Sequence, residues 1–152
     1  VFDLDDTLLM STSYKRYSDI KPDHYLNLLL FNFKYKKFIY TNGTYGHAHE
    51  SLTNMECKEL FDEIYARNTL MYMKPHIRSF NEVRNNIIYR HNNSNTDDII
   101  FFDDLLNNLK TAHDIGWVTV WIKDTNESIN DKIYINYHFR TIRDALENLK
   151  LN

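Results

Sequence analysis

Two aspartates near the start of the chain have the spacing of a catalytic acid pair. Asp3 and Asp5 follow an apolar stretch, so they stand where a buried strand is expected to end. Residues two apart on an extended chain point to the same side. Two carboxylates held together need a cation, or one of them must keep a proton. The pair could therefore supply a nucleophile, a general acid and ligands for a divalent metal.

Further polar groups stand at corresponding places along the chain. Thr41 and Asn42 follow one apolar run, Asp103 and Asp104 follow another, and Lys74 stands directly before a proline. In open α/β sheets, ligands bind beyond the carboxyl ends of the strands. We therefore expect these groups to meet the first two aspartates at one edge of a sheet.

The combination suits the transfer of a phosphoryl group. Such a group carries charge on its equatorial oxygens, and it needs donors and cations that do not react with it. Thr41 offers a hydroxyl, Asn42 a backbone N–H and Lys74 a point charge. Mg²⁺ prefers a few carboxylates together with water and phosphate oxygens. Asp3, with Asp103 or Asp104, would provide such carboxylates.

Each of these groups also has a plainer interpretation. The acidic segment Asp3–Thr7 could be an Asx-type turn that ends a strand. Lys74 could be an ordinary surface lysine, and Asp104 could be a helix N-cap, a role compatible with metal binding. Asn108 could orient the site or could be a polar surface residue.

The ordered set resembles the motifs of the haloacid-dehalogenase-like (HAD) hydrolase superfamily. The segment Asp3-Leu4-Asp5-Asp6-Thr7 is similar to its first motif, DxDx(T/V). Thr41, Lys74 and the pair Asp103-Asp104 follow in the order of the second, third and fourth motifs. The match extends over nearly the whole chain.

The resemblance implies a role for each acid. It implies that Asp3 is the nucleophile that forms an aspartyl-phosphate, and that Asp5 protonates the leaving oxygen and then activates water. It also implies Mg²⁺ held by the Asp3 carboxylate, the backbone carbonyl of Asp5 and an acid of the fourth motif, Asp103 or Asp104. By family pattern, an acid at position 5 favours phosphate-ester hydrolysis over dehalogenation.

A finer resemblance is to the pyrimidine 5′-nucleotidase branch. It is carried by Thr41-Asn42 with Gly46-His47-Ala48, by Lys74-Pro75-His76, and by Phe102-Asp103-Asp104 with Asn108. That branch has a helical cap domain between its first and second motifs. Here a loop, one helix and a strand fill this stretch, and the second possible cap position is equally short. We therefore expect little or no cap and an open site.

Three functions fit these observations. The leading one is a Mg²⁺-dependent phosphatase whose substrate is a small phosphate ester or a phosphorylated macromolecule. The second is a non-catalytic module that binds a phospho-ligand or regulates another protein, although such a module has no need of a general acid at Asp5. The third is a nucleotidase that needs a partner to complete its lid.

Composition narrows the class of protein. The chain has 152 residues and a net charge of −3, and it has no long basic run, so no nucleic-acid footprint is present. No apolar run is long enough to span a membrane. The lone Cys57 cannot form an internal disulfide, which is compatible with a reducing compartment, and we expect a cytoplasmic protein. Its side chain is expected to be a small packing residue. We expect one domain over residues 1–152, with residues missing upstream of Val1.

Apolar strands that alternate with amphipathic helices predict an α/β fold, a three-layer Rossmann-like domain with a mainly parallel sheet. Besides the opening strand, the expected strands are Phe38–Tyr40, Glu63–Ala66, Ile99–Phe102, Trp117–Ile122 and Tyr134–Phe139. Three of the expected helices start at Pro22, at His47 and at Pro75, and the second of them has Leu60 and Phe61 on its buried side. A fourth runs from Leu105 to Ile115 and ends before Gly116. A fifth follows Thr141, which is expected to cap it. Loops are expected at Ser11–Asp23 and Arg90–Asp97. His47 and His49 are expected to be ordinary residues near a helix start, not zinc ligands.

Overall fold

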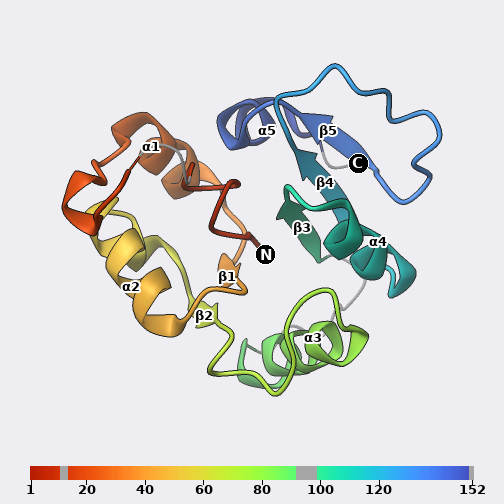
Figure 1. Cartoon of the computed structure of the whole chain (residues 1–152), viewed down its shortest axis with the longest axis horizontal. Coiled ribbons are helices and arrows are strands. Elements are labelled where there is room, and N and C mark those ends of the chain that lie inside the picture. The colour runs from red at the N-terminus through yellow and green to blue at the C-terminus, as the bar shows by residue number, and fades with distance from the viewer. Residues whose placement is uncertain (11–13, 92–98, 151–152) are drawn as a thin grey trace.

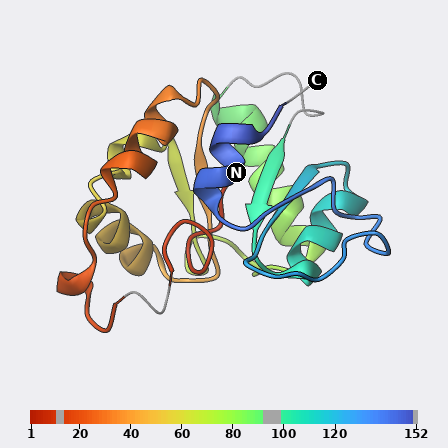
Figure 2. The ribbon, with the colours of Figure 1, turned by 90° about the horizontal axis from the view of Figure 1, so that it is seen from above.

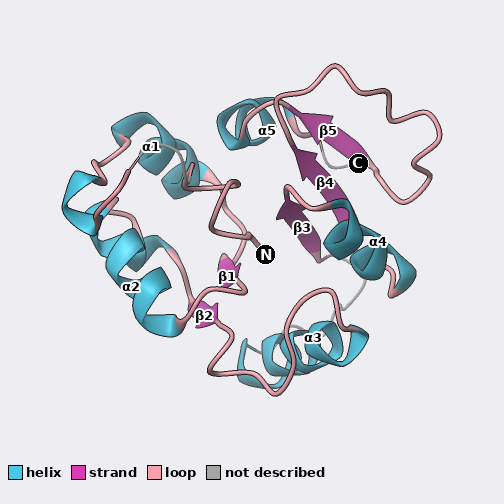
Figure 3. Cartoon of the chain, in the orientation of Figure 1, coloured by secondary structure: helices cyan, strands magenta, loops and turns pink. Residues whose placement is uncertain are grey.

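The computed structural model describes residues 1–10, 14–91 and 99–150. The paired strands are parallel and alternate with helices along the chain (Figure 3). The strands are β1 (Phe38–Tyr40), β2 (Glu63–Tyr65), β3 (Ile100–Asp103), β4 (Val118–Ile122) and β5 (Tyr137–Phe139). The helices are α1 (His24–Asn32), α2 (Tyr45–Asn54), α3 (Ile77–His91), α4 (Leu106–Asp114) and α5 (Ile142–Asn148), with short 3₁₀ helices η2 (Tyr17–Asp19) and η3 (Lys58–Leu60).

The start of the chain lies between β1 and β3 and connects them. Phe2 forms parallel bridges with Ile39 on one side and Phe102 on the other. Its N–H donates to the Phe38 carbonyl at 2.8 Å, and the Asp3 N–H donates to the Phe102 carbonyl at 2.9 Å. The expected opening strand is therefore present as a short central segment, which gives the order β2, β1, chain start, β3, β4, β5.

Alternating side chains divide the core into two clusters on opposite faces of the sheet. Phe2, Ile39 and Phe102 belong to one cluster, whereas their neighbours Tyr40 and Phe101 belong to the other. Successive residues of a strand point to opposite faces, so both faces of a buried sheet must be apolar. In Figure 1 the strands run diagonally from β2 to β5, with α1, α2 and α5 on one side and α3 and α4 on the other. Figure 2 shows the same layers from above. The predicted three-layer α/β fold is confirmed.

Capping residues set the helix boundaries, and these differ from the predicted ones. The first helix begins at His24 and not at Pro22, because the Asp23 carboxylate accepts the Leu26 N–H at 2.9 Å and acts as the N-cap. The second begins at Tyr45, with the Thr44 hydroxyl as its cap.

The predicted boundaries of α2 and α3 were also wrong. The chain leaves α2 at Met55 and Glu56, and Glu56 has a φ of 55°, so Leu60 and Phe61 lie outside that helix. The third helix begins at Ile77, not at Pro75, and it continues to His91. Arg90 and His91 are thus helical, and the rest of the loop expected at Arg90–Asp97 lies outside the described residues.

The C-terminal half follows the prediction more closely. The fourth helix begins one residue later than expected, at Leu106, and Gly116 after it has a left-handed φ of 86°. β5 is a parallel edge strand that covers only the last part of Tyr134–Phe139. Thr141 caps α5 as predicted, in a reciprocal capping box with Asp144. Within the described ranges, no helix is both long and apolar enough to cross a membrane.

The aromatic packing around Phe2 yields a stability prediction. Its ring stacks on Phe102 with the centroids 4.5 Å apart and meets Phe33 and Phe61 edge to face. We expect Phe2→Ala to lower the free energy of unfolding by about 3–5 kcal/mol, because it opens a cavity at the junction of β1 and β3. Urea denaturation measures the loss. The matched control, Phe31→Ala on the exposed side of α1, should change the stability by less than about 0.5 kcal/mol. Equal losses in the two variants would contradict this account of the core.

Candidate active site

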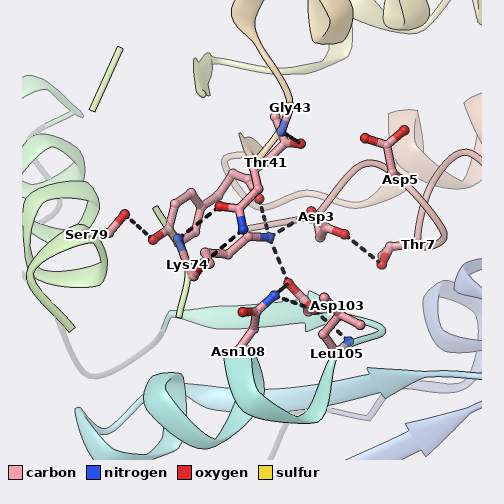
Figure 4. Close-up of polar contacts among 12 residues, drawn as sticks. Asp3, Asp5, Thr7, Thr41, Gly43, Lys74, Ser79, Asp103, Leu105 and Asn108 are labelled. Carbon is pink, nitrogen blue, oxygen red and sulfur yellow. Dashed lines mark hydrogen bonds and ion pairs between the residues drawn. The ribbon is translucent and has the colours of Figure 1, made fainter. Parts of the chain in front are cut away.

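The polar ends of the strands meet at one edge of the sheet. A cleft of about 190 Å³ lies there, and the side chains around it come from four separate parts of the chain. Figure 4 shows Lys74 among Asp3, Thr41, Asp103 and Asn108, with the Asp5 carboxylate to one side of this group. The residues that line the cleft are Asp3, Asp5, Asp6, Thr41, Asn42, Gly43, Lys74, Asp104, Leu105 and Asn108. The structure therefore brings the predicted site residues together, with Asp103 directly beneath them.

The Lys74 ammonium is the centre of this group. It donates to Asp3 Oδ1 at 2.7 Å, to Asp103 Oδ2 at 2.8 Å and to the Tyr40 carbonyl at 2.8 Å. Its side chain is only 1% exposed. Despite the cost of burial, the charges of Asp103 and Asp3 raise the pKa of Lys74, so the lysine stays protonated. Lys74 is therefore not a surface lysine.

Asn42 positions the backbone of this lysine. Its side-chain oxygen accepts the Lys74 N–H, and its side-chain nitrogen donates to the Lys74 carbonyl, both at 2.9 Å. The residue was predicted to contribute a backbone N–H to phosphate. Its side chain has a structural task besides, because it joins the loop after β1 to the loop before α3. The contact of its backbone N–H with phosphate stays a prediction.

The two acids of the fourth motif have different surroundings. Both oxygens of Asp103 accept N–H groups: Oδ1 from Leu105 at 2.8 Å, and both Oδ1 and Oδ2 from Asn108 at 3.0 Å. With Lys74 added, the fully buried Asp103 carboxylate is surrounded by donors. Asn108 therefore orients the site, which decides between the two interpretations of that residue.

Asp104 has far fewer side-chain contacts. Its carboxylate approaches the Lys123 ammonium at 3.5 Å, while its carbonyl accepts the Trp121 indole N–H at 3.0 Å. Burial, reinforced by the charge of Asp103, raises the pKa of Asp104 to about 6. It is not the N-cap of α4, because Leu105 holds that position without a side-chain cap.

Three of these acids could hold a metal. Carboxylate oxygens of Asp3, Asp103 and Asp104 lie within 4.8 Å of one another, and all three residues are buried. Hard oxygen donors at this spacing suit Mg²⁺. Because the oxygens of Asp103 already accept four N–H contacts, Asp104 and Asp3 have more capacity for an ion. The carboxylate of Asp5 is not part of this cluster, and its predicted metal contact is through the backbone carbonyl.

Asp3 belongs both to the ion pair with Lys74 and to the cluster of three acids that could hold a metal. Burial, opposed by the Lys74 ammonium, raises the pKa of Asp3 to about 7. The Thr7 hydroxyl lies 3.4 Å from its second oxygen. A nucleophilic carboxylate must be ionised, and a divalent cation beside it would favour that state. The expected repulsion among the acids is thus relieved partly by Lys74 and partly by protonation.

Thr41 is placed to donate a hydrogen bond into the cleft. Its buried hydroxyl oxygen accepts the Gly43 N–H at 2.9 Å. A hydroxyl that accepts one hydrogen bond still has its own proton to donate. The role predicted for this residue, a hydrogen bond to a phosphate oxygen, would use that proton.

The carboxylate of Asp5 contacts His47, which the sequence predicted to be an ordinary residue near a helix start, and through it Tyr17, which the sequence did not single out. His47 Nε2 lies 2.9 and 3.0 Å from its two oxygens, and the Tyr17 hydroxyl lies 2.9 Å from His47 Nδ1. His49 is exposed, and among the described residues neither histidine belongs to a group of three side chains that could hold a metal. Cys57 is buried, and burial raises the pKa of its thiol to about 12, which agrees with a packing role.

Comparison with known proteins places the chain. The model of the family described as haloacid dehalogenase-like hydrolase matches residues 23–122. Among curated proteins, no sequence matches this one.

Several solved structures share the fold. YfnB from Bacillus subtilis, named as a HAD-hydrolase and bound to magnesium, superposes with a TM-score of 0.67 at 20% identity, over 85% of this chain and 53% of its own. A predicted phosphoglycolate phosphatase from Haemophilus somnus gives 0.65 at 23% identity, over 80% and 54%. L-2-haloacid dehalogenase from Xanthobacter autotrophicus gives 0.65 at 13% identity, over 86% and 62%. This chain therefore spans little more than half of their lengths, and the likeness concerns the fold alone.

The raised pKa of Asp104 yields a prediction about stability and pH. Because its pKa rises from 3.8 in the unfolded chain to about 6 in the fold, this carboxyl stabilises the metal-free protein at low pH. That contribution is lost as the pH rises through about 6. We expect Asp104→Asn to be more stable than the wild type at neutral pH in EDTA, with the difference shrinking toward pH 4. Thermal melts across this range measure it.

The control for this experiment is Asp131→Asn, which changes an exposed acid. Its difference from the wild type should not vary with pH in the same window. A constant difference between Asp104→Asn and the wild type would show that Asp104 titrates as an ordinary surface acid.

Proposed function

We propose that this chain, which belongs to the haloacid dehalogenase-like hydrolase family, is a Mg²⁺-dependent phosphatase that acts through an aspartyl-phosphate on Asp3. The observation that carries the proposal is the shared cleft itself. A buried acid, a buried lysine between two acids, a hydroxyl donor and a separate acid at Asp5 surround a volume of about 190 Å³. This inventory matches the needs of phosphoryl transfer.

Asp5 favours phosphate esters over haloacids. An alkoxide leaves poorly unless its oxygen receives a proton, whereas a halide leaves without one. Asp5 lines the cleft, and its carboxyl is held outside the Asp3, Asp103 and Asp104 cluster. It is therefore available to exchange a proton with a substrate in the cleft, and not committed to the metal ligands. A module that only binds phosphate would gain nothing from such a group.

The proposed reaction has two displacements. An oxygen of Asp3 attacks phosphorus, the bond from phosphorus to the leaving oxygen breaks with its electron pair, and that oxygen takes the proton of Asp5. Asp5, now a carboxylate, removes a proton from water as the water oxygen attacks the phosphorus of the aspartyl-phosphate. The bond to Asp3 then breaks, which releases phosphate and restores both acids.

The remaining residues bind and orient the transferred group. The Lys74 ammonium and the Thr41 hydroxyl offer positive charge and a donor to its oxygens. Asp3, Asp104 and the backbone carbonyl of Asp5 would hold Mg²⁺, with Asp103 fixing Lys74. When bound, the ion would neutralise charge on the phosphoryl oxygens and keep Asp3 ionised.

The narrower assignment to pyrimidine nucleotides rests on the short motifs around His47 and Asp103. The described residues between the first motif and β1 form only η2 and α1 besides loops. We infer an open site without its own cap, which accepts large leaving groups. The proposed substrate class is therefore broad, and it extends to phosphorylated macromolecules.

The nucleophile can be tested directly. We expect the wild type to hydrolyse an aryl phosphate with Mg²⁺ and to stop in EDTA, and Asp3→Asn to lose at least about 10⁴-fold in kcat, because an amide cannot form the acyl-phosphate. Asp131→Asn, purified in parallel, should retain full activity. Substantial turnover by Asp3→Asn, with no trace of a host phosphatase, would remove Asp3 from this role.

The open site yields a prediction about substrates. We expect kcat/KM for a phosphopeptide to be within about tenfold of that for nucleoside monophosphates, because no cap selects a small leaving group. A panel of phosphate esters assayed at one Mg²⁺ concentration measures this. A strong preference for a single pyrimidine nucleotide would contradict the open site and would favour a nucleotidase whose lid comes from a partner.

A further inference from the structure

A residue of α2 contacts the carboxyl of Asp5 from one side. His47, in the first turn of that helix, places Nε2 at 2.9 Å from one oxygen of Asp5 and 3.0 Å from the other. A single N–H shared between both oxygens defines the plane and rotation of a carboxyl group. The contact thus helps to orient a side chain that is 36% exposed and that also has a hydrogen bond to the Tyr14 side chain.

The orientation of His47 is itself fixed. Its second ring nitrogen, Nδ1, lies 2.9 Å from the Tyr17 hydroxyl. Because Nε2 faces a carboxyl group, it can donate a ring N–H to Asp5, while Nδ1 meets the Tyr17 hydroxyl. The two hydrogen bonds connect Tyr17 through His47 to Asp5.

The surrounding backbone permits this close approach. A Cβ at Gly43 would lie 2.8 Å from the Cδ2 atom of His47 and 3.6 Å from Asp5 Oδ2. Any larger residue would push the imidazole away from the acid. The η2 segment that carries Tyr17 is anchored by Ile20, which is buried in the core shared with α2.

We propose that His47 and Tyr17 are positioning residues that aim the Asp5 carboxyl at the leaving-group oxygen. The inference rests on the proposed function and adds to it the source of the acid's orientation. Because the shared N–H of His47 fixes the plane of the carboxyl from the side of α2, the proton of the acid can be presented to a substrate in the cleft that Asp5 lines. Neither residue touches the phosphoryl group, so both act through Asp5.

The consequence depends on the leaving group. A poorly leaving alkoxide needs a well-aimed proton, whereas a dinitrophenolate departs without one. Loss of the His47 contact should therefore harm alkyl phosphates far more than dinitrophenyl phosphate. General disruption of the site would harm both esters equally.

The test compares kcat/KM for glycerol phosphate and dinitrophenyl phosphate, because this constant covers the steps up to departure of the leaving group. We expect His47→Ala to lose about 10²-fold with glycerol phosphate and less than about threefold with dinitrophenyl phosphate. His47→Gln, which can restore an N–H near the same place, should recover part of the loss. Tyr17→Phe should lose activity in the same direction by a smaller factor. His49→Ala, on the exposed side of α2, should change neither constant.

The outcomes separate this inference from the proposed function. Equal losses on the two esters in His47→Ala would overturn the positioning role while leaving the phosphatase intact. Should His47→Ala melt far below the wild type, the comparison passes to His47→Gln and Tyr17→Phe, and an unchanged ratio of the two constants in both would overturn the role. A wild type that hydrolyses neither ester would overturn the proposed function, and this inference with it.

Discussion

The structure depends on one buried cation. The Lys74 ammonium lies between the carboxylates of Asp3 and Asp103 and also donates to the Tyr40 carbonyl. A buried charge is tolerated only when it is paired and hydrogen-bonded, and here each partner comes from a different segment. The two ion pairs join the chain start and β3 to the loop before α3, and the hydrogen bond to Tyr40 joins β1 to the same loop. The arrangement that stabilises the fold is therefore the same one that shapes the site.

This pairing also divides the work among the acids. Asp103, surrounded by N–H donors, holds Lys74 and the start of α4 in place. Asp104 and Asp3 keep capacity for a metal, and burial raises the pKa of each when no metal is bound. Asp5 stands apart from them under His47. Four aspartates that look alike in the sequence thus have four different environments, and each environment suits a different task.

Local patterns predicted much of this. The abrupt change from apolar to polar residues marked the strand ends, and parallel strands bring such ends to one edge, so Thr41, Asp103 and Asp104 were placed correctly. Helix starts were less predictable. Pro22 and His47 were the predicted first helical residues, whereas the N-caps Asp23 and Thr44 set the actual starts. The roles that depend on tertiary contacts could not be predicted. Nothing in the local sequence distinguishes Asp103 from Asp104.

His47 is the clearest case of a residue that the sequence undervalued. Its motif with Gly46 and Ala48 was noticed, but a histidine near a helix start has many ordinary explanations. Only the fold shows that the first turn of α2 faces the loop after the chain start, where Asp5 lies. The same holds for Tyr17, which belongs to a polar stretch predicted to be a loop and which packs beside α2 in the structure.

The central claim is that Asp3 carries the phosphoryl group during turnover. The most direct measurement is to quench the enzyme during hydrolysis of a phosphate ester with borohydride, which reduces an acyl-phosphate to an alcohol, and to sequence the peptide that contains position 3 by mass spectrometry. The account predicts homoserine at position 3, only when both substrate and Mg²⁺ are present, and none at Asp5. Active enzyme with position 3 unmodified under these conditions, or with the reduced residue elsewhere, would contradict it.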